Sequence, residues 1–212
     1  MFPLSLFYLV FLMKGLINLG NTCYFNASLQ CLLQIPCISN HFSTNGYSGD
    51  CEFTNLYCDL VKKFWNKNST ANINVNTLLV AFQKQFPRFK GGNEEDSQEA
   101  LLCIIDILER AVPEIKPYFY GKKTQETIWP GGKSSHDEDF SIHIMSSRGN
   151  NLKDMLRESS KWNTLTDFED KEGKTHNVAT TRSYLSKLPK ILMISFDTKS
   201  HVYVDELSLI HI

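Results

Sequence analysis

One cysteine stands where a thiol could act as a nucleophile. Cys23 follows a segment rich in Gly and Asn and precedes helix-forming residues, so the sequence predicts that it opens an amphipathic helix. The positive end of a helix dipole favours a thiolate over a thiol. Asn18, five residues upstream, could direct a carboxamide N–H at negative charge that develops beside the sulfur. A thiolate with an oxyanion donor is what acyl transfer requires, although a single cysteine is more often an inert apolar residue.

Four carboxylates lie at the start of a second predicted helix. Glu94, Glu95, Asp96 and Glu99 follow a Gly-Gly pair, and the apolar residues after them recur at helical spacing as far as Arg110. Acidic side chains complement the dipole at a helix N-terminus. Taken alone, these carboxylates are therefore interpreted as solvated surface charge.

Hydrophobic periodicity predicts the other elements. We expect helices over residues 53–65, 75–82 and 151–157, and strands over residues 140–145 and 191–196. Residues 201–204 are expected to begin a hairpin partner of the last strand. The polar segments are expected to be a loop (39–50), a linker (66–74) and two exposed stretches (122–139 and 159–177).

Composition restricts the class of protein. A chain of 212 residues with 42% hydrophobic and 21% charged residues is typical of one large soluble domain, or of a core with an insertion. The net charge of −1 gives no reason to expect nucleic acid or an acidic membrane surface as a partner. Six cysteines without any CxxC pair favour reduced thiols, and hence an intracellular protein of the cytoplasm or nucleus.

The two ends of the sequence differ in character from the rest of the chain. Residues 1–12 are almost wholly apolar, but they are short for a membrane span and lack the basic region of a signal peptide. We expect this leader not to be translated and Met13 to be the true start, with a signal anchor as the alternative. Residues 207–212 can be encoded by a sequencing-adapter end, so Glu206 is expected to be the last genuine residue of a longer gene product.

Four blocks resemble the ubiquitin-specific proteases. Residues 15–32, GLINLGNTCYFNASLQCL, resemble the family's cysteine box, GLxNLGNTCYxNxxLQxL. Residues 95–99, EDSQE, are similar to its second block, QxDAxEF, with Ala100 in place of the usual Phe. Residues 119–121 resemble its F-x-G turn and residues 188–196 its LPxxLxxxLxRF strand. The blocks occur in the family's order across residues 15–200.

The resemblance implies both a fold and an activity. The fold would be α+β, a papain-like cysteine protease with thumb, palm and fingers, in which residues 13–206 form a partial catalytic domain that lacks the C-terminal part of the palm. The activity would be that of a thiol-dependent deubiquitinase, which hydrolyses the bond after the C-terminal glycine of ubiquitin through a thioester. By the same resemblance, Cys23 is the nucleophile, Asn18 is the oxyanion donor, and Asp96 and Glu99 bind the arginines of the ubiquitin tail. Ubiquitin and ubiquitinated proteins would be its partners.

Two parts of the family's pattern are missing. The fingers often hold a zinc ribbon of two CxxC pairs, but residues 122–139 and 159–177 contain no cysteine, so we expect neither metal nor cofactor. The family's general base is a histidine in a GHY-type block beyond the LPxxL strand. None of the six histidines has that context: His41, His136, His143, His176, His201 and His211. This chain by itself is therefore expected to have little or no activity.

Two other functions stay open at this point. The chain could be a ubiquitin-binding pseudoprotease that uses the same groove without chemistry. It could also be a protease for another ubiquitin-like modifier. Residues that bind only the C-terminal tail of a modifier do not contact its folded part, so they do not distinguish one modifier from another.

Overall fold

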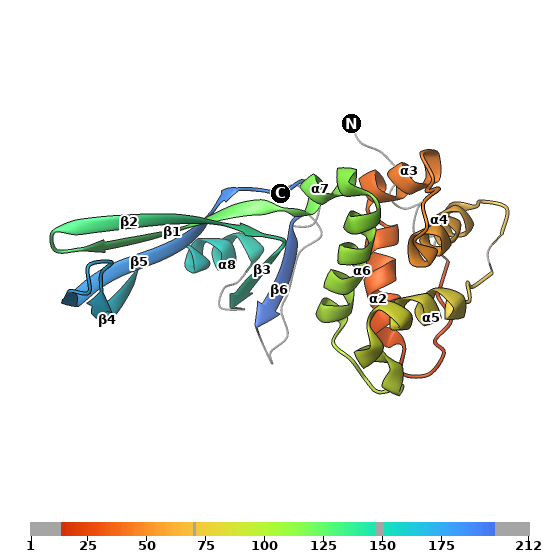
Figure 1. Ribbon diagram of the computed structural model, residues 1–212, viewed down its shortest axis with the longest axis horizontal. Coiled ribbons are helices and arrows are strands. Elements are labelled where there is room, and N and C mark those ends of the chain that lie inside the picture. Colours follow the sequence, from red (N-terminus) through yellow and green to blue (C-terminus); the bar gives the residue numbers. More distant parts are fainter. Residues whose placement is uncertain (1–13, 70, 147–150, 198–212) are drawn as a thin grey trace. The chain divides into compact units, whose positions relative to one another are not determined.

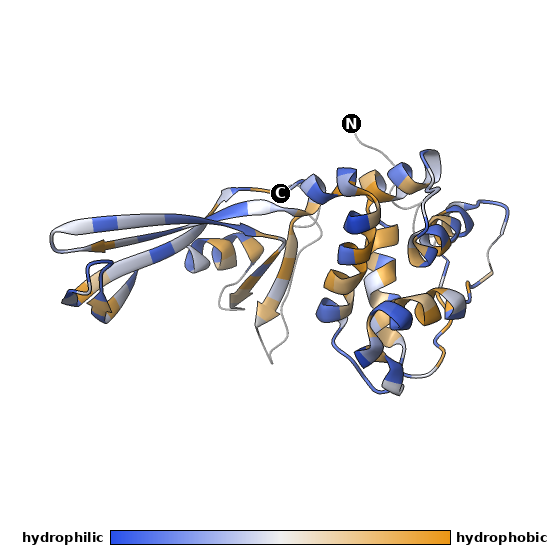
Figure 2. Cartoon of the chain, in the orientation of Figure 1, coloured by the Kyte–Doolittle hydropathy of each residue, from blue (hydrophilic) through white to orange (hydrophobic). Residues whose placement is uncertain are grey.

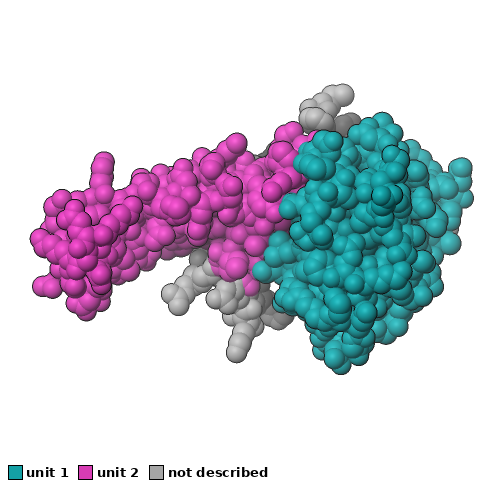
Figure 3. All heavy atoms as spheres, viewed as in Figure 1, with its two compact units in different colours: residues 1–115 teal, residues 116–212 magenta. Residues whose placement is uncertain are grey.

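The computed structural model describes residues 14–69, 71–146 and 151–197. The chain divides into two compact units, residues 1–115 and 116–212 (Figure 3). In the described ranges, no helix has both the length and the apolar character needed to cross a membrane. The leader, the last residues and the expected hairpin partner at 201–204 lie outside these ranges.

The first unit is helical (Figure 1). Its elements are α2 (Cys23–Leu33), α3 (Pro36–Thr44), α4 (Glu52–Trp65), α5 (Asn76–Gln85), the 3₁₀ turn η1 (Pro87–Gly91), α6 (Ser97–Ala111) and η2 (Pro113–Ile115). The structure confirms four predicted helices: the one that begins at Cys23, those at 53–65 and 75–82, and the one after the Gly-Gly pair. The loop predicted over 39–50 is wrong in its first part, which belongs to α3. Pro36 suits the first turn of that helix, and Ile38 and Phe42 bury one of its sides.

Aromatic rings fill the centre of this unit. The ring of Phe82 on α5 lies 5.1 Å from Phe25, 6.2 Å from Phe53, 5.4 Å from Phe86 and 4.8 Å from Phe89, measured between centroids. Except for Phe86, these side chains are almost completely buried. The cluster therefore joins α2, α4, α5 and η1 through hydrophobic burial and ring packing.

The second unit contains most of the β structure. Its elements are α7 (Lys116–Phe119), β1 (Gly121–Trp129), β2 (Gly132–Phe140), β3 (Ile142–Ser146), α8 (Leu152–Ser159), β4 (Asn163–Glu169), β5 (Thr175–Lys187) and β6 (Met193–Asp197). The strands form an antiparallel sheet in the order β2-β1-β5-β4, while β3 pairs in parallel with β6. The predicted helix near 151–157 and the strands near 140–145 and 191–196 are confirmed.

The β1–β2 hairpin lies in the polar segment 122–139, and complementary polar side chains pair across it. Figure 2 shows β2 as mainly hydrophilic, and most of its residues are exposed, as expected for that segment. Apolar alternation could not reveal its strands. The register instead places complementary side chains opposite one another: Lys122 and Asp139 (3.1 Å), Lys123 and Glu138 (2.9 Å), and Thr124 and Asp137 (2.7 Å).

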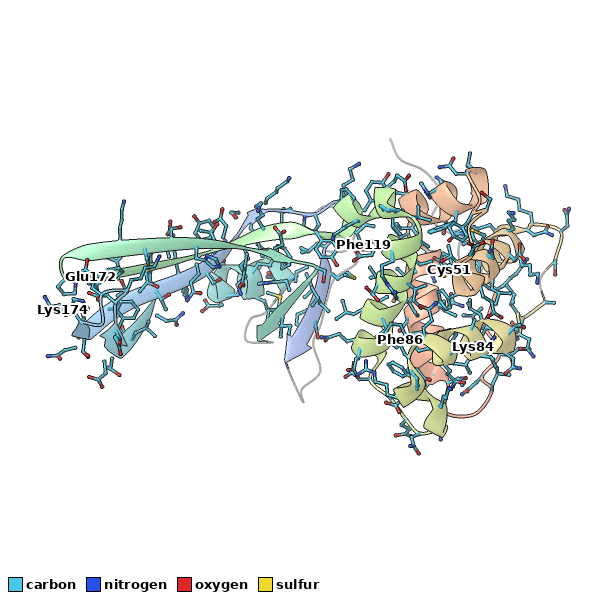
Figure 4. The ribbon with its side chains drawn as sticks, in the orientation of Figure 1. Cys51, Lys84, Phe86, Phe119, Glu172 and Lys174 are labelled. Carbon is cyan, nitrogen blue, oxygen red and sulfur yellow. The ribbon has the colours of Figure 1, made fainter. Side chains whose placement is uncertain are left out.

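The β1–β2 and β4–β5 hairpins meet in a group that we call the hairpin clasp: Trp129, Phe168, Asp170 and His176. The indole of Trp129 lies 5.2 Å from the ring of Phe168 and 5.9 Å from that of His176. The imidazole Nε2 of His176 is 2.7 Å from one carboxylate oxygen of Asp170. The other oxygen accepts the backbone N–H groups of Glu172 and Lys174, which Figure 4 labels in the β4–β5 turn.

The clasp does not have the residues of a zinc site. Its members include no thiolate, and the described residues contain no group of three or more His, Cys, Asp or Glu side chains placed to hold a metal ion. Packing of Trp129 on the rings of Phe168 and His176 joins the two hairpins instead, while the His176–Asp170 pair lies within the β4–β5 hairpin. That the protein needs no zinc stays a prediction.

The His–Asp pair gives the clasp a pH dependence. The hydrogen bond with His176, followed by the backbone N–H of Lys174, holds the pKa of Asp170 below its ordinary value. A group whose pKa is lowered by folding contributes stability above its unfolded pKa, and that contribution is lost as the pH falls. Asp170→Asn should therefore lower the melting temperature near neutral pH, and the difference from wild type should shrink below about pH 4.

Thermal unfolding followed by circular dichroism at several pH values measures this difference. Asp167→Asn is a matched control, because it removes a carboxylate from the same hairpin and the described residues give Asp167 no histidine partner. A difference for Asp170→Asn that stays constant from neutral pH to about pH 3 contradicts the assignment.

Candidate active site

Cys23 is the exposed first residue of α2, as the sequence predicts. The chain reaches it through a tight turn in which Gly20 (φ +92°) and Asn21 (φ +46°) adopt left-handed backbone conformations. Glycine and asparagine are the residues that tolerate this region most readily. The composition of the loop thus allows the turn that presents the thiol at the positive end of the helix dipole.

The side chain of Asn18 holds this turn together. Its Oδ1 accepts the backbone N–H of Gly20 (3.1 Å), the backbone N–H of Thr22 (3.3 Å) and the hydroxyl of Thr22 (3.0 Å). Backbone N–H groups can only donate, so the atom that faces them must be the oxygen. The Nδ2 group, which makes no hydrogen bond to the described residues, is then left as a donor.

Polar side chains on α2 fasten the loop from the other side. The Nδ2 of Asn26 donates to the carbonyl of Ile17 (3.1 Å), and the Nε2 of Gln30 donates to that of Lys14 (3.0 Å). The loop backbone also pairs with Ile73, since the N–H of Ile17 donates to the Ile73 carbonyl at 2.9 Å. Sequence reasoning missed these roles. The i, i+4 spacing of Asn26 and Gln30 was the available signal, because it places both on one face of the helix.

The buried side chain of Lys14 anchors the start of this loop. Its ammonium group donates to the carbonyls of Asn66 (2.8 Å) and Lys63, where α4 ends. A cation at a helix C-terminus is favoured by the dipole and satisfies carbonyl groups that lack helical partners.

The helix that carries the acidic block packs against the cysteine helix. The hydroxyl of Ser28 on α2 donates to the carbonyl of Ser97 at the start of α6 (2.9 Å), and the Nδ2 of Asn21 donates to the carbonyl of Gly92 (2.9 Å). The ring of Tyr24 stacks on Phe89 of η1 at 5.6 Å. The structure therefore brings the cysteine loop, η1 and the N-terminus of α6 together.

The two candidate tail-binding carboxylates make contacts within this region. Asp96 is the N-cap of α6, and its Oδ1 accepts the backbone N–H of Glu99 (2.9 Å). Glu99 is exposed and forms an ion pair with Arg88. Burial first, and then the charge of Glu95, raise the pKa of the hydroxyl of Tyr24, the residue that follows the cysteine.

Four of the six histidines lie in the described residues, and of these four His41 belongs to the same unit as Cys23. His41 lies on α3, with its Nδ1 3.3 Å from Asn45. His136 lies on the exposed strand β2. Burial, and then the charge of Lys123, lower the pKa of His143 on β3. His176 belongs to the hairpin clasp. All six cysteines are described, and each is a free thiol.

Comparison with known proteins identifies the family. A family model described as "Ubiquitin carboxyl-terminal hydrolase" matches residues 14–204. The chain belongs to the ubiquitin carboxyl-terminal hydrolase family. Over 147 residues it is 34% identical to ubiquitin carboxyl-terminal hydrolase 9 of Arabidopsis thaliana, an alignment that covers 59% of this chain and 16% of the relative. Over 101 residues it is 35% identical to human ubiquitin carboxyl-terminal hydrolase 21, which covers 44% of this chain and 18% of the relative.

A solved structure supports the fold. A chain in the structure of the SAGA Ubp8/Sgf11/Sus1/Sgf73 DUB module bound to ubiquitin aldehyde matches with a TM-score of 0.74 and 20% sequence identity. The match covers 88% of this chain and 47% of that one. The fold is thus the α+β, papain-like fold expected from the resemblance. The chain spans less than a fifth of the length of the two curated relatives and about half of the solved one.

Proposed function

We propose that this chain carries the nucleophile of a thiol-dependent deubiquitinase, which hydrolyses the bond after the C-terminal glycine of ubiquitin. The observation that carries the proposal is the position of Cys23: it is exposed, it opens α2, and it follows a loop that fixes the Asn18 carboxamide with its N–H donors unused by the described residues. Family membership supplies the substrate class.

The chemistry follows from these groups. The Cys23 thiolate attacks the carbonyl carbon of the terminal glycine, a C–S bond forms, and the carbonyl electrons move onto oxygen. Asn18 Nδ2 and nearby backbone N–H groups hold that oxyanion. When the intermediate collapses, the lysine amine leaves with a proton, and water then hydrolyses the thioester. We assign the proton transfers to a histidine outside the described residues, because none of the four described histidines has the sequence context of the family's general base.

Asp96 and Glu99 are the proposed binding residues for the tail. Both are exposed at the N-terminus of α6, which packs on the cysteine helix. A guanidinium prefers a carboxylate that can accept two of its N–H groups. Ubiquitin and ubiquitinated proteins are the proposed partners, and the bound ubiquitin aldehyde of the solved relative supports this. Six free thiols favour a reducing compartment, so the proposed location is the cytoplasm or nucleus. The proposed catalytic region is residues 13–206, without zinc or another cofactor.

Probes of different modifiers test this function against its rivals. Ubiquitin and two other ubiquitin-like modifiers, each carrying a C-terminal electrophile, are incubated separately with the 212-residue chain, and adducts are separated by electrophoresis. The proposal expects an adduct with the ubiquitin probe. Adducts with another modifier alone would instead identify a protease for that modifier. Ubiquitin that binds in calorimetry but forms no adduct, even after long incubation at a pH above the ordinary pKa of a cysteine thiol, would identify the pseudoprotease.

A further inference from the structure

Arg88 forms an ion pair with Glu99, the carboxylate that the proposed function assigns to a substrate arginine. It projects from η1, and its guanidinium forms the ion pair with Glu99, 11 residues further along the chain. The same guanidinium lies 4.6 Å from the ring centroid of Phe89 and 3.5 Å from the sulfur of Cys103. Three contacts thus hold one cation over the exposed side of α6, at the carboxylate that the proposed function assigns to the ubiquitin tail.

The position of η1 places this pair beside the cysteine helix. Phe89, the neighbour of Arg88, is buried and stacks on Tyr24, which follows Cys23 directly. Gly92, just beyond η1, accepts the hydrogen bond from Asn21 of the cysteine loop. Arg88 therefore projects from a turn that packs against the first turn of the cysteine helix.

We propose that Arg88 is an internal competitor for the arginine-bearing tail of the substrate: it occupies Glu99 in the free protein and must release it before the tail binds. This inference rests on the proposed function, because it needs Glu99 as a tail-binding residue. A tail guanidinium that binds Glu99 in the bidentate geometry takes both carboxylate oxygens and also repels the like charge of Arg88, so the tail and Arg88 compete for Glu99. The exchange is feasible because both side chains are 48% exposed and can turn into solvent. After it releases Glu99, the guanidinium of Arg88 still has its cation–π contact with the ring of Phe89.

The competition predicts tighter binding when Arg88 is neutralised. Arg88→Gln and Arg88→Met should each strengthen the binding of ubiquitin by about two- to fivefold, the range that corresponds to an exposed ion pair. Met preserves the apolar stem over Phe89, so the two variants separate charge from packing. Arg110→Gln is the matched control, because Arg110 lies on α6 in an ion pair with Asp106 and its loss changes the net charge equally. It should leave the affinity unchanged.

Isothermal titration calorimetry of ubiquitin binding to the 212-residue chain and to each variant tests this inference. The gain should disappear when the tail arginines of ubiquitin are replaced by glutamine, and also when Glu99→Gln is combined with Arg88→Gln. If Glu99→Gln weakens binding while Arg88→Gln and Arg88→Met do not strengthen it, the competitor is refuted and the proposed function stands. If ubiquitin binds neither the wild type nor any variant, both fail.

Discussion

Replacing Cys23 by alanine is expected to abolish covalent capture of ubiquitin that carries a C-terminal electrophile. No other thiol is presented at the first residue of a helix after a loop that orients a carboxamide. Because the side chain is exposed, its loss should leave the fold intact and the noncovalent affinity for ubiquitin unchanged. Adduct formation with time, followed by electrophoresis, measures the effect.

The same helix provides a matched control. Cys31 is also exposed, two turns further along α2, where it has no access to the helix N-terminus. The protein atoms around it partly desolvate the thiol of this residue and raise its pKa, which disfavours the thiolate at neutral pH. Cys31→Ala should form the adduct at the wild-type rate. An adduct that persists in Cys23→Ala, or disappears in Cys31→Ala, contradicts the assignment.

Replacing Asn18 by alanine is expected to slow acylation of Cys23 roughly tenfold to a thousandfold, the loss typical of one oxyanion-hole donor. The substrate is ubiquitin activated as a thioester of a small thiol, whose leaving group departs as a thiolate and needs no general acid. Attack on it still passes through the oxyanion that Asn18 Nδ2 is proposed to hold. Single-turnover transfer of ubiquitin to the chain gives the rate.

Asn18 has a second role, so its variant needs a control for loop structure. Its Oδ1 holds Gly20 and Thr22, and Asn18→Ala removes these hydrogen bonds along with the donor. Thr22→Val removes the hydroxyl that donates to Oδ1 and accepts from the backbone of Leu19, while it leaves the carboxamide in place. A much smaller loss in Thr22→Val is expected. Equal losses in the two variants would assign the effect to loop distortion, and the oxyanion role would be wrong.

Local signals made the cysteine helix predictable. The turn needs left-handed residues at positions 20 and 21, and Gly20 and Asn21 are the types that supply them. The helix α6 and the strand β6 were likewise predictable, α6 from apolar residues at helical spacing and β6 from a short apolar run, although the side chains of β6 that the structure describes are only half-buried. Where the pattern was polar, as in β1 and β2, cross-strand charge pairs define the strands, and hydropathy does not report them.

Contacts between distant residues could not be read from the sequence. The ion pair of Arg88 with Glu99 depends on how η1 approaches α6, and the packing of Trp129 on Phe168 depends on the order of strands in the sheet. The acidic block looked like dipole-complementing charge, and Asp96 does cap α6. The structure adds that Glu99 already has a cationic partner, which no local pattern could indicate.

The most direct test of the account locates the adduct on the wild-type chain. After reaction with the ubiquitin probe, the chain is digested, and the peptide that carries the tail remnant of ubiquitin is identified by mass spectrometry. The account predicts the remnant on Cys23. A remnant on Cys31, Cys37 or another cysteine would contradict the claim that the loop at residues 18–22 and the start of α2 form the catalytic centre.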